Sequence, residues 1–289
     1  MIQFEQYRPL LFSIAYRMTG SAMDAEDIVQ EAYIRCQAVD QEKIENPKAY
    51  LTTTVTRLAL NYLTSARVQR ETYLGPWLPE PIAGGDTTIS PDPAHLFGEY
   101  DSISLAFMVL LENLTPAERA VFILREVFEF PYTEIAAILD KSEAACRKLS
   151  SRARSYISAN RPRFQVQPDE HLRLLEQFIA STEKGDLPGL TNLLAEDAMM
   201  WADGGGRARG AATQPLYGRE RVAQFLIGVS ERFTPVNARV SIADVNGRPA
   251  LVVRDAQNMP AFVVAIETGG GKIQKIWAMA NPDKLHGIS

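Results

Sequence analysis

The sequence contains few of the residues that build covalent or metal-based scaffolds. Its 289 residues include two cysteines, Cys36 and Cys146, which form no C-x-x-C pair. They allow neither a disulfide framework nor a zinc site, so a reducing cytoplasm is the simplest setting. The N-terminal residues lack the basic stretch and apolar core of a signal peptide, and no segment approaches the roughly 18 apolar residues that a membrane span needs. We therefore expect a cytoplasmic protein with no metal, no cofactor and no membrane contact.

Positive charge is also scarce over the whole chain. Its 30 Lys and Arg residues are outnumbered by 35 Asp and Glu residues, which gives a formal net charge of -5. This balance by itself argues against a nucleic-acid-binding protein. Hydrophobic residues make up 46% and charged residues 22%, a globular composition that excludes a wholly disordered, collagen-like or coiled-coil protein. A chain of this length is expected to form two or three folded units.

Proline and glycine divide the chain into parts. The segment from Gly75 to Pro93 contains five prolines and three glycines, which is typical of a linker. This linker also contains Trp77 and Leu78, which a passive spacer does not need. We predict a helical domain, the linker, a second helical domain and a third domain at residues 1–74, 75–96, 97–160 and 168–289.

The third domain differs in kind from the two helical ones. Amphipathic helices are expected first, at 172–182, 187–194 and 219–233. Runs rich in β-branched residues follow at 238–245, 250–254, 261–266 and 272–277. Asn246-Gly247, between the first two runs, is a strong hairpin signal. Helices followed by an antiparallel meander predict a compact α+β domain.

A basic helix is expected near residue 150. A short helix from Tyr132 to Asp140 is followed by a turn, and a second helix begins near Glu143. One face of the second helix is apolar, and the opposite face carries Arg147, Lys148, Arg152 and Arg154. Between residues 141 and 163, seven Lys or Arg and one acid give a local net charge of +6. This pattern is typical of a helix-turn-helix motif, whose second helix enters the DNA major groove. A solvated amphipathic helix with a basic face fits the pattern equally well.

An acidic stripe is expected on a helix that begins near Asp24. Asp24, Asp27 and Glu31 share one side of that helix, where like charges repel by a few tenths of a kcal/mol. Binding to a partner is one interpretation. Capping is favoured on these residues alone, because Asp24 can cap the helix and Asp27 lies near the positive end of its dipole. Glu31 can pair with Arg35.

A long helix is predicted to begin at Asn46-Pro47, with asparagine as the cap and proline in the first helical position. Its expected buried stripe is Leu51, Val55, Leu58, Tyr62 and Ala66. The other side is polar with modest charge, and it offers Thr53, Arg57, Asn61, Thr64, Arg67 and Arg70. Such a face could follow a single DNA strand, although a plain surface face is the simpler interpretation.

Three segments in this order match a known pattern. They are Asp24-Ala-Glu-Asp-Ile-Val-Gln-Glu-Ala, Pro47-Lys-Ala-Tyr-Leu with Thr56-Arg-Leu-Ala-Leu-Asn, and Leu114-Thr-Pro-Ala-Glu-Arg followed by Tyr132-Thr-Glu-Ile-Ala. Over about residues 1 to 160 the chain resembles the bacterial extracytoplasmic-function (ECF) sigma factors of the sigma-70 family. The last part looks like a SnoaL-like domain, a cone of helices and a curved sheet around a cavity, which one subgroup of these factors carries. The marks of that subgroup are Trp77-Leu-Pro-Glu-Pro81, Asp203-Gly-Gly-Gly-Arg207 and Asn281-Pro-Asp-Lys-Leu285.

The resemblance implies a multidomain protein with two all-α sigma domains, region 2 and the region 4 helix-turn-helix, and an α+β SnoaL-like domain. It implies a sigma factor without catalytic residues that binds RNA polymerase core and promoter DNA. The surface for the β′ clamp helices would contain Asp24, Asp27, Gln30 and Glu31. The -10 element would meet Arg57, Asn61, Thr64, Arg67 and Arg70. The -35 element would meet Arg147, Lys148, Ser151, Arg152 and Arg154. The family often has Asp and Arg where this chain has Asn61 and Thr64, which affects promoter details.

For the third domain the resemblance implies control in cis through the linker. In the linker it assigns this role to Trp77, Leu78, Pro79, Glu80 and Pro81. In the domain it assigns the same role to Asp203, Gly204, Gly205, Gly206, Arg207, Asn281, Pro282, Asp283, Lys284 and Leu285.

The residues alone leave other interpretations of the third domain open. The Asp203 segment can be a simple turn, because glycines allow positive φ. A helix-turn-helix regulator could instead be fused to a domain that binds a small-molecule ligand or catalyses a reaction, with Asp203 as acid-base and Met199 and Trp201 lining a pocket. A lone carboxylate is a poor signal for such catalysis. The three histidines, His95, His171 and His286, are expected at the surface, away from any pocket.

Promoter binding should depend on polymerase. An isolated helix-turn-helix gains mostly salt-sensitive phosphate contacts, whereas two tethered sites gain effective concentration once both are presented. We expect weak promoter binding by the free protein and specific binding in the presence of core polymerase, measured by gel shift. Equally tight binding without core polymerase would contradict this expectation.

Overall fold

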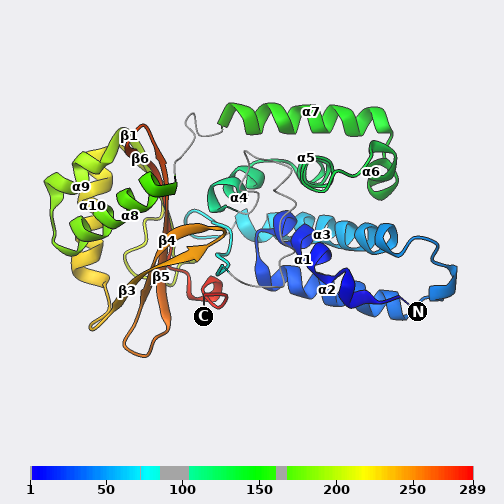
Figure 1. Ribbon diagram of the computed structural model, residues 1–289, viewed down its shortest axis with the longest axis horizontal. Helices are drawn as coiled ribbons and strands as arrows, with labels where there is room; N and C mark the ends of the chain where they lie inside the picture. Colours follow the sequence, from blue (N-terminus) through cyan, green and yellow to red (C-terminus); the bar gives the residue numbers. More distant parts are fainter. Residues whose placement is uncertain (1, 72, 85–103, 161–167, 289) are drawn as a thin grey trace. The chain divides into compact units, whose positions relative to one another are not determined.

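The computed structural model describes residues 2–71, 73–84, 104–160 and 168–288, except for the side chains of 66–71. Contacts divide these residues into two compact units (Figure 1). Unit 1 combines 2–71 with 104–160, so it contains most of both predicted helical domains; residues 73 and 74 belong to unit 2, and 97–103 lie outside the described residues. Unit 2 combines 73–84 with 168–288, so the first part of the predicted linker belongs with the third domain. Residues 85–96 of that linker lie outside the described residues.

The first segment of unit 1 folds into three helices with short 3-10 turns. They are η1 (Phe4–Gln6), α1 (Arg8–Thr19), α2 (Ala22–Gln37), η2 (Gln41–Lys43) and α3 (Pro47–Glu71). The Asn46 side chain accepts a hydrogen bond from the amide of Ala49 at 3.1 Å, which confirms the predicted start of α3. Gly20, with φ of 73°, ends α1 in a left-handed cap.

The second segment of unit 1 forms the predicted helix-turn-helix and its support. It contains α4 (Leu105–Glu112), α5 (Pro116–Phe122), the π-helical turn η4 (Ile123–Val127), α6 (Tyr132–Leu139) and α7 (Glu143–Asn160). Thr115 and Glu118 form a capping box at the start of α5. Asp140, in a left-handed conformation, ends α6, and Ser142 Oγ accepts a hydrogen bond from the amide of Ala145 to begin α7. No described helix of either unit combines the length and apolar character that crossing a bilayer requires.

The buried side of α3 differs from the predicted stripe. Leu51 and Val55 are fully buried as expected, but Leu58 and Tyr62 are only half-buried, and the side chain of Ala66 is not described. The fully or largely buried positions also include Ala59, Leu63, Thr52 and Thr56. The cause is that α3 packs against α1 and α2 and also against α5 and α6, so a wider arc of its surface is covered.

Unit 2 is an α+β domain, in agreement with the predicted fold class. Its helices are α8 (Pro168–Glu183), α9 (Leu187–Leu193) and α10 (Arg219–Phe233). Its strands are β1 (Leu194–Asp203), β2 (Leu216–Tyr217), β3 (Arg239–Val245), β4 (Arg248–Arg254), β5 (Pro260–Gly269) and β6 (Lys272–Met279), and a 3-10 turn, η5 (Pro282–Lys284), follows. The Asn246-Gly247 hairpin joins β3 and β4 as predicted.

The sheet is not the simple antiparallel meander that the sequence suggests. Its order is β2-β1-β6-β5-β4-β3, and β1 pairs with β6 in parallel. Strand β1 carries no clear strand signal in the sequence, because it follows α9 without a break and exposes the acidic residues Glu196 and Asp197. The pairing places Trp201 beside Trp277, whose rings stack with centroids 6.2 Å apart.

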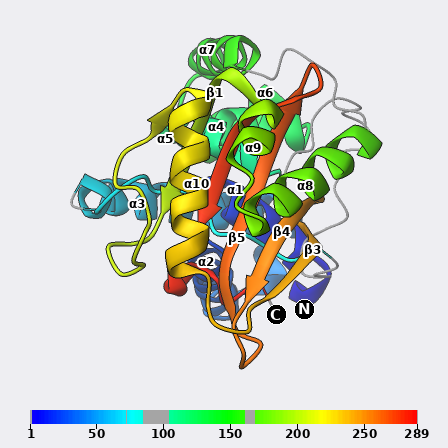
Figure 2. The ribbon, with the colours of Figure 1, turned by 90° about the vertical axis from the view of Figure 1, so that its left-hand side faces the viewer.

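The two faces of the sheet are covered differently. Helices α8, α9 and α10 cover one face, where Leu174, Phe178 and Val222 pack against strand residues such as Leu251 and Ile276 (Figure 2). The segment 73–84 and the C-terminal turn η5 lie on the opposite face (Figure 1). The sheet therefore presents the end of β1 and the β3–β4 hairpin to the segment that follows α3.

Two threonine hydroxyls are a weak point of α3. Thr52 and Thr56 are fully buried, and neither hydroxyl has a hydrogen-bond partner among the residues described. Because an unpartnered buried hydroxyl costs about 1–3 kcal/mol, Thr52→Val should raise the free energy of unfolding by about 1 kcal/mol. The melting temperature should rise by about 2–4 °C.

Thr53→Val is the matched control. Its hydroxyl donates to the Ala49 carbonyl at 2.7 Å, so its loss should bring no gain in stability. Equal effects of the two substitutions would show that the Thr52 hydroxyl is not unsatisfied.

Candidate nucleic-acid interface and linker-binding site

The basic face of α7 is exposed, and the opposite face of this helix is buried against the rest of region 4. Cys146, Ala153 and Ile157 are buried on the inner side. Arg147 pairs with Glu143 at 2.9 Å, and its guanidinium lies 4.6 Å from the ring centroid of Tyr132.

The other predicted residues of this face are all exposed. Arg152 lies 3.7 Å from Glu118, and Arg154 lies 3.6 Å from Glu126, both carboxylates of the supporting elements. Lys148 and Ser151 point outward without a described ion pair. The five predicted -35 residues therefore share one solvent-facing surface, on which Arg152 and Arg154 lie near acids of the supporting elements and Arg147 pairs with an acid of α7 itself.

Some polar side chains on this face of α3 are exposed, but two of them already make hydrogen bonds within the protein. Arg57, Asn61 and Thr64 are exposed. The Arg57 guanidinium donates to the carbonyls of Ile138 at 2.9 Å and Ala137 at 3.1 Å, at the end of α6. Thr64 donates to the carbonyl of Leu60 within its own helix. Arg67 and Arg70 lie in the last turns of α3, whose side chains fall outside the described part.

The acidic residues of α2 are not equivalent. Ser21, and not Asp24, caps the helix, because its side chain accepts a hydrogen bond from the amide of Asp24 at 3.2 Å. The Asp24 carboxylate instead accepts a hydrogen bond from Tyr62 at 2.6 Å. Glu31 pairs with Arg35 at 2.8 Å, as the capping interpretation allowed.

Asp27 and Gln30 are the exposed members of the predicted polymerase-binding group on α2. Neither takes part in a described ion pair. They lie one turn apart on the solvent side of the helix, so they are the residues of this group that a partner can reach without breaking an existing contact.

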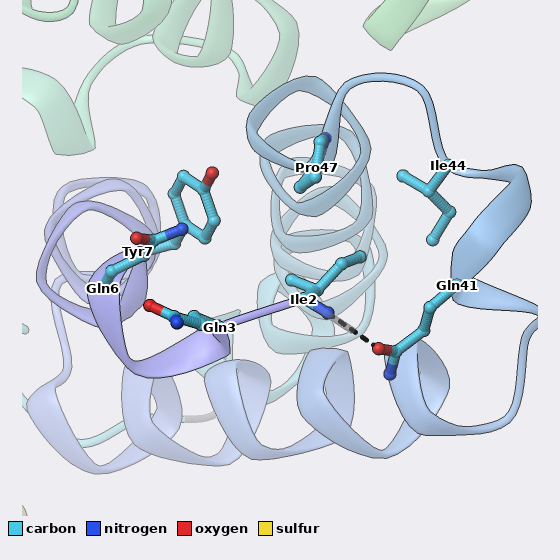
Figure 3. Close-up of a pocket in the computed structure, with 7 residues that line it drawn as sticks. All are labelled: Ile2, Gln3, Gln6, Tyr7, Gln41, Ile44 and Pro47. Atoms are coloured by element: carbon cyan, nitrogen blue, oxygen red, sulfur yellow. Dashed lines mark hydrogen bonds between the residues drawn. The ribbon is translucent and has the colours of Figure 1, made fainter.

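An open pocket of about 400 Å³ lies near the N-terminus of unit 1 (Figure 3). Gln3, Gln6 and Gln41 contribute amide side chains to its wall, and the amide of Ile2 donates to the Gln41 side chain at 2.8 Å. Its lining has no carboxylate, histidine, lysine or arginine. Among the described residues no group of three His, Cys, Asp or Glu could hold a metal ion.

Asp203 is the centre of the second site. It is the last residue of β1 and is fully buried. One carboxylate oxygen accepts hydrogen bonds from the Tyr73 hydroxyl at 2.5 Å and the amide of Gly205 at 3.1 Å. The other accepts from the amide of Leu78 and from Lys284 Nζ, each at 2.8 Å. Both oxygens are thus committed, which leaves no free carboxylate for the acid-base role considered above.

Lys284 links the same site to the linker. Its ammonium also donates to the Leu78 carbonyl at 2.6 Å and lies 3.9 Å from the ring centroid of Trp77. A cation this close to an indole face is stabilised by the ring quadrupole. The ring of Tyr73 lies 5.2 Å away. Lys284 therefore holds the strand carboxylate and the linker together, and we call this set (Tyr73, Trp77, Leu78, Asp203 and Lys284) the clasp.

Tyr73 enters the clasp as a protonated donor. Burial is the main cause that raises the pKa of its phenol above the ordinary range, and the Asp203 carboxylate adds to the effect. Asn281 donates to the same hydroxyl oxygen at 2.9 Å. Tyr73 is a functional residue that the sequence does not predict, because one tyrosine near a helix end carries no pattern.

The glycines after Asp203 are needed for close approach. Gly205 has a φ of 59°, and a Cβ there would lie 2.5 Å from the side chain of Asn281. Gly206 has a φ of 72°, and a Cβ would lie 3.3 Å from Leu74. Arg207 forms an exposed ion pair with Asp283 at 2.9 Å. The structure thus brings the Asp203 and Asn281 segments together with the linker.

A second anchor holds the linker four residues after Leu78. The amide of Ile82 donates to the Asn246 side chain at 3.0 Å, and the amide of Asn246 donates to the Ile82 carbonyl at 2.8 Å. Gly84 donates to the Asp244 carbonyl at 2.7 Å. Asn246 was predicted only as a hairpin residue. Its linker contact has no sequence signal, because hairpin asparagines are common.

One expectation about the histidines is wrong. His171 is not a surface residue: it is 3% exposed, and its Nε2 lies 2.9 Å from the Pro249 carbonyl. It stands on the buried side of amphipathic α8, where the hydrogen bond of one ring nitrogen to a backbone carbonyl helps to make the burial of a polar ring tolerable. His286 is exposed as expected, and His95 lies outside the described ranges.

The chain is similar to known sigma factors over nearly its whole length. The profile of Sigma-70 region 2 matches residues 3–68, and that of Sigma-70 region 4 matches residues 104–157. ECF RNA polymerase sigma factor SigJ of Mycobacterium tuberculosis is 37% identical over 294 residues, covering 99% of this chain and 93% of SigJ. The probable ECF sigma factor SigI of the same organism is 33% identical over 284 residues, covering 96% and 92%. The crystal structure of SigJ superimposes with a TM-score of 0.75 at 34% identity, covering 99% and 98%.

The ion pair of the clasp should dominate the stability of unit 2. Lys284→Met leaves Asp203 as a buried carboxylate without a cation, which should lower the free energy of unfolding by about 3–5 kcal/mol. Thermal unfolding of the full chain measures the loss.

Lys272→Met is the matched control, because Lys272 is an exposed lysine of the same unit. Its effect should stay within about 0.5 kcal/mol. If the two variants melt together, the buried pair does not hold unit 2.

Proposed function

Because the chain belongs to the ECF RNA polymerase sigma factors, it is an alternative sigma factor that directs transcription initiation, and we propose that unit 2 controls this activity in cis by holding the linker. The observation that supports this most is the clasp, in which Asp203 and Lys284 grip backbone and side-chain groups of residues 73–78. In this proposal unit 2 acts as a regulator and not as an enzyme, in the cytoplasm where the polymerase works.

The contact surfaces of unit 1 complete the proposal. Asp27 and Gln30 of α2 face the polymerase, and Asp24 and Glu31 support them. The polar face of α3 meets the -10 element. The exposed basic face of α7 meets the -35 element, since arginine and lysine can neutralise phosphates and hydrogen-bond guanine edges.

Holding the linker limits how far regions 2 and 4 can separate. The connection between α3 and α4 contains the 33 residues 72–104. Fully extended, it spans at most about 115 Å. Once residues 73–84 are held, the 20 residues that remain before α4 span at most about 70 Å. The -10 and -35 elements lie about 25 base pairs apart, about 85 Å of duplex at about 3.4 Å per base pair. The state of the clasp therefore bears directly on whether both elements can be reached.

The clasp is suited to a reversible role. Its linker partners are mostly backbone groups, a phenol and an indole, which water can solvate after release. Asp203 and Lys284 both lie in residues 168–288, apart from the linker segment 73–84, so they can remain paired when that segment leaves. Release thus avoids the large penalty of separating a buried charge from its partner.

Trp77→Ala tests the proposal without breaking the Asp203–Lys284 pair. The substitution removes the indole beneath the Lys284 ammonium, a contact worth about 2 kcal/mol when desolvated. We expect faster limited proteolysis of the linker. We also expect transcript yield with core polymerase at limiting sigma factor to change, rising up to about tenfold as the released fraction grows.

Tyr217→Ala is the control, because Tyr217 is an aromatic residue of unit 2 that is 58% exposed and is not one of the clasp residues. Deleting residues 168–289 removes the described partners of the linker segment 73–84 in the third domain and should also change the yield strongly. Unchanged transcription in both Trp77→Ala and the deletion would refute control in cis.

A further inference from the structure

Arg119 joins the two sigma regions inside unit 1. It lies on α5 of region 4 and is 2% exposed. Its Nη1 donates to the carbonyl of Met18, in the last turn of α1 in region 2, at 2.6 Å. The same nitrogen donates to Glu112 at 2.5 Å, and the Glu112 side chain is 13% exposed. A buried cation of region 4 thus caps the end of a region 2 helix.

Arg57 makes the reverse contact. It lies on α3 of region 2 and donates to the carbonyls of Ala137 and Ile138, in the last turn of α6 in region 4. Each region therefore supplies one arginine to the C-terminus of a helix in the other region.

Helix C-termini are suitable acceptors for such contacts. The last four carbonyls of a helix have no partner within it, and they form the negative end of the helix dipole. A cation there contributes about 0.3–1 kcal/mol when exposed and up to about 2 kcal/mol when partly buried. Arg119, which is buried and paired, is therefore expected to contribute more than the exposed Arg57.

These contacts conflict with promoter engagement. In unit 1 the face of α3 assigned to the -10 element touches α6, the first helix of the motif assigned to the -35 element. The two elements lie about 85 Å apart along the duplex. The contacts of Arg57 and Arg119 between regions must therefore break before both elements are bound.

We propose that Arg57 and Arg119 form a reciprocal helix-capping latch that keeps regions 2 and 4 closed in the free sigma factor. In the closed form the Arg57 guanidinium is occupied by carbonyl oxygens. Opening frees it for the anionic and carbonyl oxygens of promoter DNA, so the residue exchanges one set of acceptors for another.

Unsatisfied buried polar groups lower the free-energy cost of opening the latch. Arg119 Nε is buried and has no acceptor within the described ranges, and the Thr52 and Thr56 hydroxyls of α3 share this property. An unsatisfied buried polar group costs about 1–3 kcal/mol, so any of these groups that becomes hydrated on opening favours the open form. The latch lies within unit 1 and does not depend on the clasp of unit 2.

The distance between regions in the full chain is the direct test. Spin labels at Gln37→Cys on α2 and Ser158→Cys on α7 report it by pulsed electron resonance. Both positions are exposed, and the native Cys36 and Cys146 are fully buried and resist labelling. Burial also raises the pKa of both native thiols, which keeps them unreactive. The measurement uses the free protein, without polymerase or DNA.

Arg119→Lys and Arg57→Ala should each add a longer-distance population. We expect the ratio of closed to open molecules to fall about tenfold for Arg119→Lys and about threefold for Arg57→Ala. The apparent Kd for core polymerase, measured without promoter DNA, should fall by up to the same factors, because binding then starts from the open form. Because Arg57 is exposed, Arg57→Ala keeps the test informative if Arg119→Lys lowers stability.

Arg125→Lys is the matched control. Arg125 lies in η4, donates to the Phe130 carbonyl and packs on Tyr132, all within region 4. Its distance distribution should match that of the wild type. The latch is refuted if Arg57→Ala and a folded Arg119→Lys both keep the wild-type distribution, or if Arg125→Lys opens the protein equally. Because the clasp is intact in all these variants, that result would leave control by unit 2 standing.

Discussion

The buried carboxylate of Asp203 is the constraint around which unit 2 is organised. A charge at the end of β1 with no exposure is tolerated only if it is paired and hydrogen-bonded. The segments that follow β6 and β1 provide Lys284 and the amide of Gly205, and the linker provides Tyr73 and the amide of Leu78. Because half of these donors come from residues 73–78, the bound linker completes the hydrogen bonding of this charge. The same requirement explains the glycines, since a side chain at Gly205 would collide with Asn281.

Unit 1 applies the same principle to backbone groups. Helix ends leave carbonyls that need donors, and arginines from the other region provide them. Arginines of this acidic chain therefore lie in two kinds of place. Some are exposed on α7, close to acids of the supporting elements. Two others, Arg57 and Arg119, lie at helix ends between the regions. A net charge of -5 hides this distribution, which is why the total charge gave a misleading first indication of partners.

Local signals in the sequence predicted local structure well. Asn46-Pro47 begins α3, Asn246-Gly247 makes the hairpin, and the helix-turn-helix falls where the basic pattern places it. Contacts that depend on distant residues could not be predicted this way. The parallel pairing of β1 with β6, the hydrogen bond from Tyr62 to Asp24 and the burial of His171 each depend on a partner at least 38 residues away. The Asp203 and Asn281 segments stood out in the sequence, but Tyr73 and Asn246, which complete the linker site, carry no pattern of their own.

Control through the connection has a physical advantage over control by covering DNA-binding faces. A domain that covered α7 would have to compete with DNA for the same cations, and its affinity would fall with salt as DNA binding does. A clasp on the linker instead changes the effective concentration of one promoter-binding region relative to the other, which affects only the bivalent complex. Salt screens the buried pair of Asp203 and Lys284 only weakly, so the clasp can remain closed at salt concentrations that weaken phosphate contacts. The basic surface of α7 can then stay exposed while the protein is inactive, because a single region on DNA gains little without the other.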